Sequence, residues 1–245
     1  RVQSVALRIV CDREREIESF INREYWTVEA DMVSAGGSPF NARLSYWNGK
    51  KLTQFDLNNE QDARRAQADV QAGVYKISAV ETKPATRNPF PPFTTSTLQQ
   101  EASRKLGFTA SHTMRVAQAL YEEGAITYMR TDGVQMAGEA IAAARDMIAK
   151  TFGAGPDVLP EKPRIYTTKA KNAQEAHEAI RPTDLAKAHH GSSDNGKLYE
   201  LIWKRTIASQ MASARMERTA VDLAASDGKT QLRATGQVVL SPGFL

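Results

Sequence analysis

The sequence predicts a mixed α and β protein, in which a β-rich domain is interrupted by a helical insertion. Apolar and polar residues alternate with a period of two in several short runs within residues 25–82 and 218–240, which is typical of half-buried strands. Between these ranges, residues 94–213 carry apolar residues at helical spacing. A stretch with four prolines, residues 83–93, separates the first strands from the helices.

The N-terminal part begins with a helix and continues as a hairpin. Residues 5–20 place apolar side chains near a 3.6-residue period, with charges interleaved at i,i+4. Strands are expected over 25–32, 42–47 and 51–55, because Asn48-Gly49 is a strong hairpin turn signal. A helix capped by Asn58 or Asn59 then runs to Ala72, and a strand follows over 74–82.

The insertion is expected to be helical, with polar caps and glycine stops marking its helices. Helices are predicted over 98–106, 111–123, 139–152, 174–180 and 197–213, with a short strand-like segment over 126–129. Strands over 218–224 and 230–240 flank an Asp227-Gly228 turn. The predicted domains are residues 1–24 from a larger, truncated helical domain, a β domain of 25–92 and 214–245, and a helical domain of 93–213.

Composition indicates a globular chain and excludes several classes of protein. The 245 residues are 41% apolar and 24% charged, with a formal net charge of +4 that permits nucleic-acid binding. A single cysteine, Cys11, excludes an internal disulfide framework. No apolar run approaches a membrane span, and no signal peptide opens the chain. Because it starts without Met, we expect an excised fragment.

The strongest chemical signal is Tyr128 two residues before Arg130. In extended backbone these side chains face one side, so both can address one phosphate. A guanidinium stabilises a phenolate and binds phosphate oxygens bidentately, which suits phosphoryl transfer. The alternative is a half-buried strand tyrosine with a solvated arginine neighbour.

A second signal is His177 with Arg181. On the predicted helix over 174–180 their i,i+4 spacing shares a face, so together they can hold a phosphate. It is not a zinc-protease motif, because a cation replaces the second imidazole. The alternative is a surface histidine near a helix end.

Other basic segments offer weaker DNA-binding signals. The helices over 98–106 and 111–123 are joined by a tight turn at Gly107 and can form a helix-turn-helix, with Arg115 near the DNA backbone. The first helix can meet phosphates through Arg1, Gln3, Ser4 and Arg8, or simply be a salt-bridged solvated face. No P-loop, Gly-rich dinucleotide loop or Asp-x-Asp pair occurs.

Four ordered motifs together resemble bacterial type IA DNA topoisomerase I. They are Arg1–Ser4 with Arg13–Ile17, Thr95–Ala102, Ile126–Asp132 and Ala176–Thr183. The resemblance covers residues 1–184, and the tail resembles the return into the family's β domain. One departure is Gly133, where the family leads us to expect Ser.

The resemblance implies a mechanism and a set of site residues. Tyr128 would attack single-stranded DNA to form a 5′-phosphotyrosyl link, Arg130 would stabilise the phosphate, and His177 would contact it. Strand passage and religation would relax negatively supercoiled DNA without ATP. The residues expected to contact DNA are Arg1, Gln3, Ser4, Arg8, Ser96, Thr97, Gln100, Arg115, Thr131, Asp132 and Arg181.

The resemblance also implies what lies outside this chain. Family members hold Mg²⁺ in a Toprim domain that nothing here matches, so we expect no metal ligands here and no relaxation by the fragment alone. We expect a monomeric, cytoplasmic, nucleoid-associated enzyme that binds DNA and no membrane. The alternatives are a non-catalytic helix-turn-helix DNA-binding module and a structural protein without nucleic acid.

Overall fold

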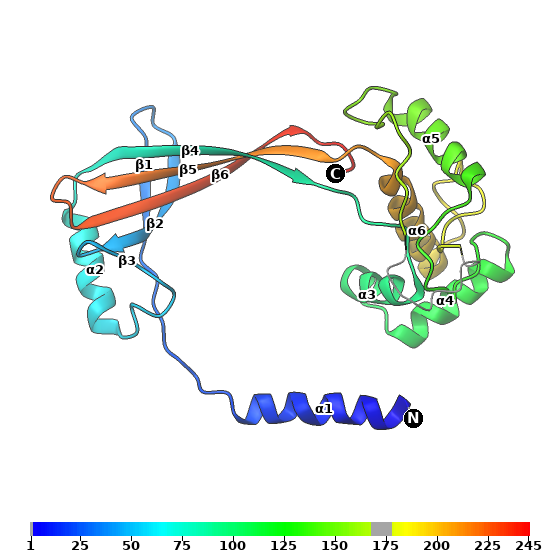
Figure 1. The fold of residues 1–245 in the computed structure, drawn as a ribbon, viewed down its shortest axis with the longest axis horizontal. Helices are drawn as coiled ribbons and strands as arrows, with labels where there is room; N and C mark the ends of the chain where they lie inside the picture. The colour runs from blue at the N-terminus through cyan, green and yellow to red at the C-terminus, as the bar shows by residue number, and fades with distance from the viewer. Residues whose placement is uncertain (1, 168–177) are drawn as a thin grey trace. The chain divides into compact units, whose positions relative to one another are not determined.

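The computed structural model describes residues 2–167 and 178–245 (Figure 1). The helices are α1 (Val2–Glu18), α2 (Glu60–Ala72), α3 (Thr95–Leu106), α4 (Ala110–Glu122), α5 (Gly138–Phe152) and α6 (Ser193–Gln210). The strands are β1 (Glu29–Val33), β2 (Pro39–Trp47), β3 (Lys50–Lys51), β4 (Tyr75–Arg87), β5 (Ala214–Ala225) and β6 (Thr230–Ser241). The predicted mixture of helices and strands is confirmed.

The chain divides into two compact units. The first comprises residues 1–83 and 218–237, and the second comprises residues 84–217 and 238–245. The boundary therefore falls within β4, β5 and β6. The predicted domain limits, including a separate domain for residues 1–24, stay predictions.

The first unit is built on a sheet with the order β1-β2-β6-β5-β4, and β3 pairs with β2. β2 runs antiparallel to β1 and to β6, with Arg43 opposite both Glu29 and Arg233. Asn48 and Gly49 have φ of 51° and 76°, as a tight two-residue hairpin turn requires. The core gathers Val28, Ala42, Leu44, Leu57, Ala66, Val70, Leu223 and Leu232.

The strand β4 is longer than predicted and takes up part of the proline-rich stretch. It runs through Pro84 to Arg87, whereas the sequence pattern ended the strand at Thr82. Because β4 is an edge strand of the sheet, Pro84 is tolerated there: a proline removes a donor that an edge can spare. The strand expected over 51–55 was also wrong, since β3 ends at Lys51.

In the second unit, α6 packs against α3, α4 and α5 (Figure 1). Its core joins Leu98, Leu120 and Ile202, all fully buried, with Ile126 and Met129 from the segment after α4. The helical spacing predicted an apolar face of Met114, Ala117, Leu120 and Tyr121: Ala117 and Leu120 lie in this core and Met114 packs against it, but Tyr121 is 41% exposed. The tyrosine-bearing segment is thus part of the core packing of this unit.

The helix α1 contributes no buried residue to a core. None of the residues Val2–Glu18 is buried, and Val5, Leu7 and Ile9 are all more than half exposed. Arg8 is paired with Asp12 at 2.8 Å on the same helix. Within the described ranges, no helix is long and apolar enough to cross a membrane.

Candidate active site

The segment after α4 alternates between buried and exposed residues. Tyr128 is 49% exposed, and Arg130 and Asp132 are also exposed. Met129 and Thr131, which lie between them, are buried. Residues 128–134 include bends and no regular strand, and isolated bridges join Ile126 to Pro182 before them and Gln135 to Glu178 after them. The alternation leaves Tyr128 and Arg130 both exposed to solvent, and that they address one phosphate stays a prediction.

The first turn of α3 holds this segment from one side. The Thr95 hydroxyl donates to the Met129 carbonyl at 2.7 Å and accepts from the Thr131 N–H at 2.9 Å. The Thr95 N–H also donates to the Thr131 carbonyl at 2.9 Å. Arg130 is therefore flanked on both sides by backbone groups bound to Thr95.

Residues 179–183 hold the segment from the other side. The Thr127 hydroxyl donates to the Ala179 carbonyl at 2.7 Å and accepts from the Arg181 N–H at 2.9 Å. The Thr183 N–H donates to the Ala125 carbonyl at 3.0 Å. Thr127, the residue before Tyr128, is thus bonded to residues 179–181 through its side chain, and its N–H also donates to the Arg181 carbonyl at 2.9 Å.

The ring of Tyr128 has one aromatic neighbour among the described contacts, Tyr121 at the end of α4. Their centroids are 5.4 Å apart and their planes lie at 69°. This edge-to-face arrangement is favourable, because the positive edge of one ring meets the negative face of the other. It restricts the orientations that the Tyr128 ring can adopt.

The segment 178–182 is not the end of a helix, so that prediction was wrong. Glu178 bridges Gln135 and Ile180 bridges Phe93, which are extended pairings. Pro182 disfavours helical backbone at the residue before it, and the bonds from Thr127 favour the extended form. His177 lies outside the described residues. The argument that His177 and Arg181 share a helix face therefore fails, because Arg181 is not helical.

Arg181 is bound to protein groups rather than directed into solvent. Its Nε donates to Glu178 at 2.7 Å and its Nη1 to the Pro182 carbonyl at 2.9 Å. Glu178 also accepts from the Ala137 N–H at the start of α5. Burial raises the pKa of Glu178, but bonds from Arg181 and Ala137 and the charge of Arg181 lower it by more, and the net pKa is lowered. The pair fixes residues 178–182 against α5.

The remaining predicted DNA contacts that the structure describes lie on three helices, α3, α4 and α1. Ser96, Thr97 and Gln100 are exposed on the first turns of α3, next to the Thr95 contacts, and the Gln100 amide donates to Ser96 at 3.1 Å. Arg115 is exposed in the middle of α4. Gln3, Ser4 and Arg8 are exposed on α1, and Arg1 lies outside the described residues. Of the described residues, Thr131 and Asp132 belong to the tyrosine segment, Arg181 is bonded to Thr127, and Ser96 directly follows Thr95 on α3.

Four residues that the sequence patterns did not single out shape this site: Thr95, Tyr121, Thr127 and Glu178. The run Thr94–Thr97 suggested helix caps, and Thr94 with Thr97 does form a capping box. Nothing in the local pattern indicated that Thr95 bonds to residues more than thirty positions away.

The described residues do not fit a magnesium site. Across residues 2–167 and 178–245, no three His, Cys, Asp or Glu side chains come close enough together to hold a metal ion. Hard divalent cations need several oxygen ligands, and Asp132 is one carboxylate.

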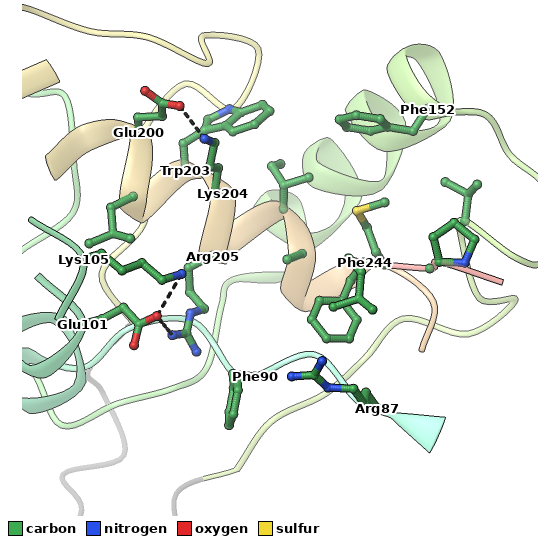
Figure 2. Close-up of a pocket in the computed structure, with 18 of the residues that line it drawn as sticks. Arg87, Phe90, Glu101, Lys105, Phe152, Glu200, Trp203, Lys204, Arg205 and Phe244 are labelled. Atoms are coloured by element: carbon green, nitrogen blue, oxygen red, sulfur yellow. Dashed lines mark ion pairs between the residues drawn. The ribbon is translucent and has the colours of Figure 1, made fainter. Parts of the chain in front are cut away.

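The second unit also contains a cavity of about 1000 Å³ whose lining does not include Tyr128. Figure 2 shows Lys105 and Arg205 directed at Glu101, and Lys204 at Glu200. The Arg205 guanidinium also lies 5.1 Å from the ring centre of Phe90 and 4.4 Å from that of Phe93. A hydrogen bond from Lys105, with the charges of Lys105 and Arg205, outweighs burial and lowers the pKa of Glu101. These cations are thus paired within the protein.

The predicted helix-turn-helix corresponds to α3 and α4, which are in contact (Figure 1). Gly107 ends α3 with a φ of 70°, so the tight turn has the left-handed residue that it needs. Phe108 and Val116 point into the core. Pairs of short helices that pack in this way also occur in ordinary protein cores, so the geometry does not by itself favour DNA recognition by α4.

The whole chain matches known topoisomerases. A family model described as DNA topoisomerase covers residues 1–245. The chain is 62% identical to DNA topoisomerase 1 of Zymomonas mobilis over 245 residues, which is all of this chain and 20% of that protein. It is 48% identical to DNA topoisomerase 1 of Xylella fastidiosa over 262 residues, covering 32% of that protein.

A solved structure shares the fold. Full-length topoisomerase I from Thermotoga maritima matches with a TM-score of 0.77 and 32% identity, covering 99% of this chain and 39% of that one. The chain thus spans between a fifth and two fifths of the length of these proteins. The four ordered motifs and these matches agree, and the chain belongs to the bacterial type IA DNA topoisomerase I family.

Proposed function

We propose that Tyr128 is the nucleophile of a type IA topoisomerase and that this chain is the part that carries it. The observation behind this proposal is that Tyr128 and Arg130 are both exposed while the backbone between them is buried and bonded to Thr95. A nucleophile and a cation are thus presented together on a fixed backbone, which is what phosphoryl transfer requires.

The proposed step is a transesterification on single-stranded DNA. The Tyr128 Oη forms a bond to phosphorus as the P–O3′ bond breaks, which leaves a 5′-phosphotyrosyl link. The phenol proton is lost and the departing 3′ oxygen gains one, so charge and atoms balance. Arg130 neutralises the negative charge that builds up on the phosphate oxygens. Religation is the reverse step, and no nucleotide hydrolysis is needed.

The activity of the whole protein is part of the same proposal. Strand passage and relaxation of negatively supercoiled DNA would need segments outside this chain, as would the acidic residues that bind Mg²⁺. His177 would contact the phosphate near the break. We expect a monomer that works on the bacterial nucleoid in the cytoplasm, and we expect the 245-residue chain alone not to relax DNA.

A covalent-adduct assay tests the proposal. The chain is mixed with Mg²⁺ and a 3′-labelled single-stranded oligonucleotide, with and without a separately produced Toprim domain, and is then quenched with denaturant. DNA-linked protein is expected only when both parts are present. It should disappear in Tyr128→Phe and persist in Tyr25→Phe, which alters a tyrosine of similar exposure, 51% against 49%.

The other outcomes are equally informative. An adduct that survives Tyr128→Phe would place the nucleophile elsewhere. If an intact topoisomerase carrying this chain formed no adduct, the tyrosine would be structural. The non-catalytic helix-turn-helix module would then be favoured, and sequence-preferring duplex binding unaffected by Tyr128→Phe would support it.

A further inference from the structure

Two threonines make the same unusual contact in this site. The Thr95 hydroxyl donates to the carbonyl of Met129 and accepts from the N–H of Thr131. The Thr127 hydroxyl donates to the carbonyl of Ala179 and accepts from the N–H of Arg181. In each case one hydroxyl closes a bridge between residues n and n+2 of a distant segment, and the bridged residue between them is Arg130 or Ile180.

Both bridges hold the segment that carries Tyr128 and Arg130, one before the other along the chain. Thr127 precedes Tyr128 and attaches it to residues 179–181, while Thr95 binds the two residues on either side of Arg130. Ile180 is itself fixed, because it is fully buried and its N–H donates to the Phe93 carbonyl at 2.8 Å. The chain is therefore held by the Thr127 bridge just before Tyr128 and by the Thr95 bridge on both sides of Arg130.

The bridge made by Thr95 comes from a helix that is anchored in the core. It sits in the first turn of α3, whose Leu98 and Ala102 are fully buried. Met129 and Thr131 are themselves buried, so water does not readily replace the hydroxyl if it is removed. A helix anchored in the core is a firmer base for a reacting group than a loop.

We propose that Thr95 and Thr127 are positioning residues for the cleavage step, with Thr95 setting the direction of Arg130 relative to Tyr128. This inference rests on the function proposed above. Neither hydroxyl touches DNA: each acts through the backbone that carries the nucleophile and the cation. Because the reaction depends on alignment, loss of a bridge should slow cleavage without weakening DNA binding.

The test uses an intact topoisomerase carrying this chain and compares Thr95→Val, which keeps the shape but removes the hydroxyl, with Thr95→Ser, which retains it. Single-turnover adduct formation is measured at saturating oligonucleotide, and oligonucleotide affinity is measured separately. We expect Thr95→Val to slow cleavage about 10- to 100-fold, with affinity changed less than about twofold. Thr95→Ser should restore the rate to within about threefold of wild type.

The matched control is Thr94→Ala. Thr94 caps the same helix through the Thr97 N–H but makes neither bridge, so it reports what a simple loss of α3 stability does. Its melting temperature should fall while its cleavage rate at saturation is maintained. Thr127→Val and Thr127→Ser form a second pair with the same expectations. If Thr95→Val does not fold, Thr95→Cys, a weak donor of similar shape, should fall between the serine and valine rates.

Several results would overturn the inference. They are a wild-type rate in Thr95→Val or Thr95→Cys, a failure of Thr95→Ser to restore the rate, and an equal loss of rate in Thr94→Ala. Failure of the proposed function itself looks different, because the unmodified enzyme would then form no adduct or Tyr128→Phe would keep it.

Discussion

The ring of Tyr121 meets the ring of Tyr128 edge-on, with centroids 5.4 Å apart. Tyr121 lies in the last turn of α4, so the contact connects the proposed nucleophile to a helix of the core. We expect Tyr121→Phe to keep the cleavage rate, because the ring contact is unchanged. Tyr121→Leu should slow it about 2- to 10-fold, the equivalent of an aromatic pair worth about 0.5–1.5 kcal/mol. Single-turnover cleavage by both variants measures this, and equal rates would show that the contact is incidental.

Arg130 is expected to be required for its charge and its geometry. Arg130→Gln should reduce the cleavage rate at saturating DNA by about 10²- to 10³-fold, as loss of one donor to a developing charge does. Arg130→Lys should recover part of this, because an ammonium keeps the charge but loses bidentate binding. Lys204→Gln, at an exposed cation already paired with Glu200, is the control and should cleave normally. A normal rate in Arg130→Gln would contradict the proposed role.

The Glu178–Arg181 pair should stabilise the fold in a pH-dependent way. The pKa of Glu178 is lowered in the folded state from 4.5, so its contribution is present above that pH and is lost as the pH falls through the folded-state pKa. Glu178→Gln should cost about 1.5–3 kcal/mol at neutral pH, typical of hydrogen bonds to a charged group.

Denaturant unfolding of both proteins at several pH values measures this. The difference between them should shrink below the usual pKa of a glutamate, since the wild-type carboxyl is then protonated as well. A difference that stayed constant down to pH 2 would mean that the pair contributes packing and not charge.

Arg205 is expected to matter for stability because it is largely buried and its guanidinium lies close to the rings of Phe90 and Phe93. Its side chain is 16% exposed and lies 3.7 Å from Glu101. Arg205→Ala should destabilise the protein by about 1–3 kcal/mol, since the packing of a largely buried side chain is lost while Glu101 keeps Lys105 as a partner. Lys204→Ala, one position earlier and 65% exposed, should change stability by less than about 1 kcal/mol. Thermal or denaturant melting compares them, and similar losses in both variants would argue against the buried pair.

Most elements of the fold were predictable because their signals are local. Asn59 caps α2 through the Asp62 N–H, and Gly107 closes α3, as the residue types indicated. The errors occurred where tertiary contacts override local preference. Residues 178–180 have helix-forming neighbours, yet bridges to Gln135 and Phe93 keep them extended. Pro84 looked like a strand end, but the edge position of β4 accommodates it.

The same distinction between local signals and tertiary contacts applies to the candidate site. The spacing of Tyr128 and Arg130 predicted that the two side chains share one side of an extended backbone; both are exposed in the structure, and their action on one phosphate stays a prediction. The i,i+4 spacing of His177 and Arg181 predicted a shared face, and this failed because the required helix is absent at Arg181. The spacing of two residues predicts a shared face only where the backbone adopts the conformation that the spacing assumes.

The sequence by itself determined the alternation of elements, the motifs that identify the family, and the pairing of a tyrosine with an arginine two residues later. Only the tertiary structure decided what holds that pair in place. The hydroxyls of Thr95 and Thr127 bind segments 36 and 54 positions away, and Glu178 is bound to α5. Such contacts depend on how the whole unit packs, and a hydrogen bond between distant segments leaves no periodic trace in the sequence.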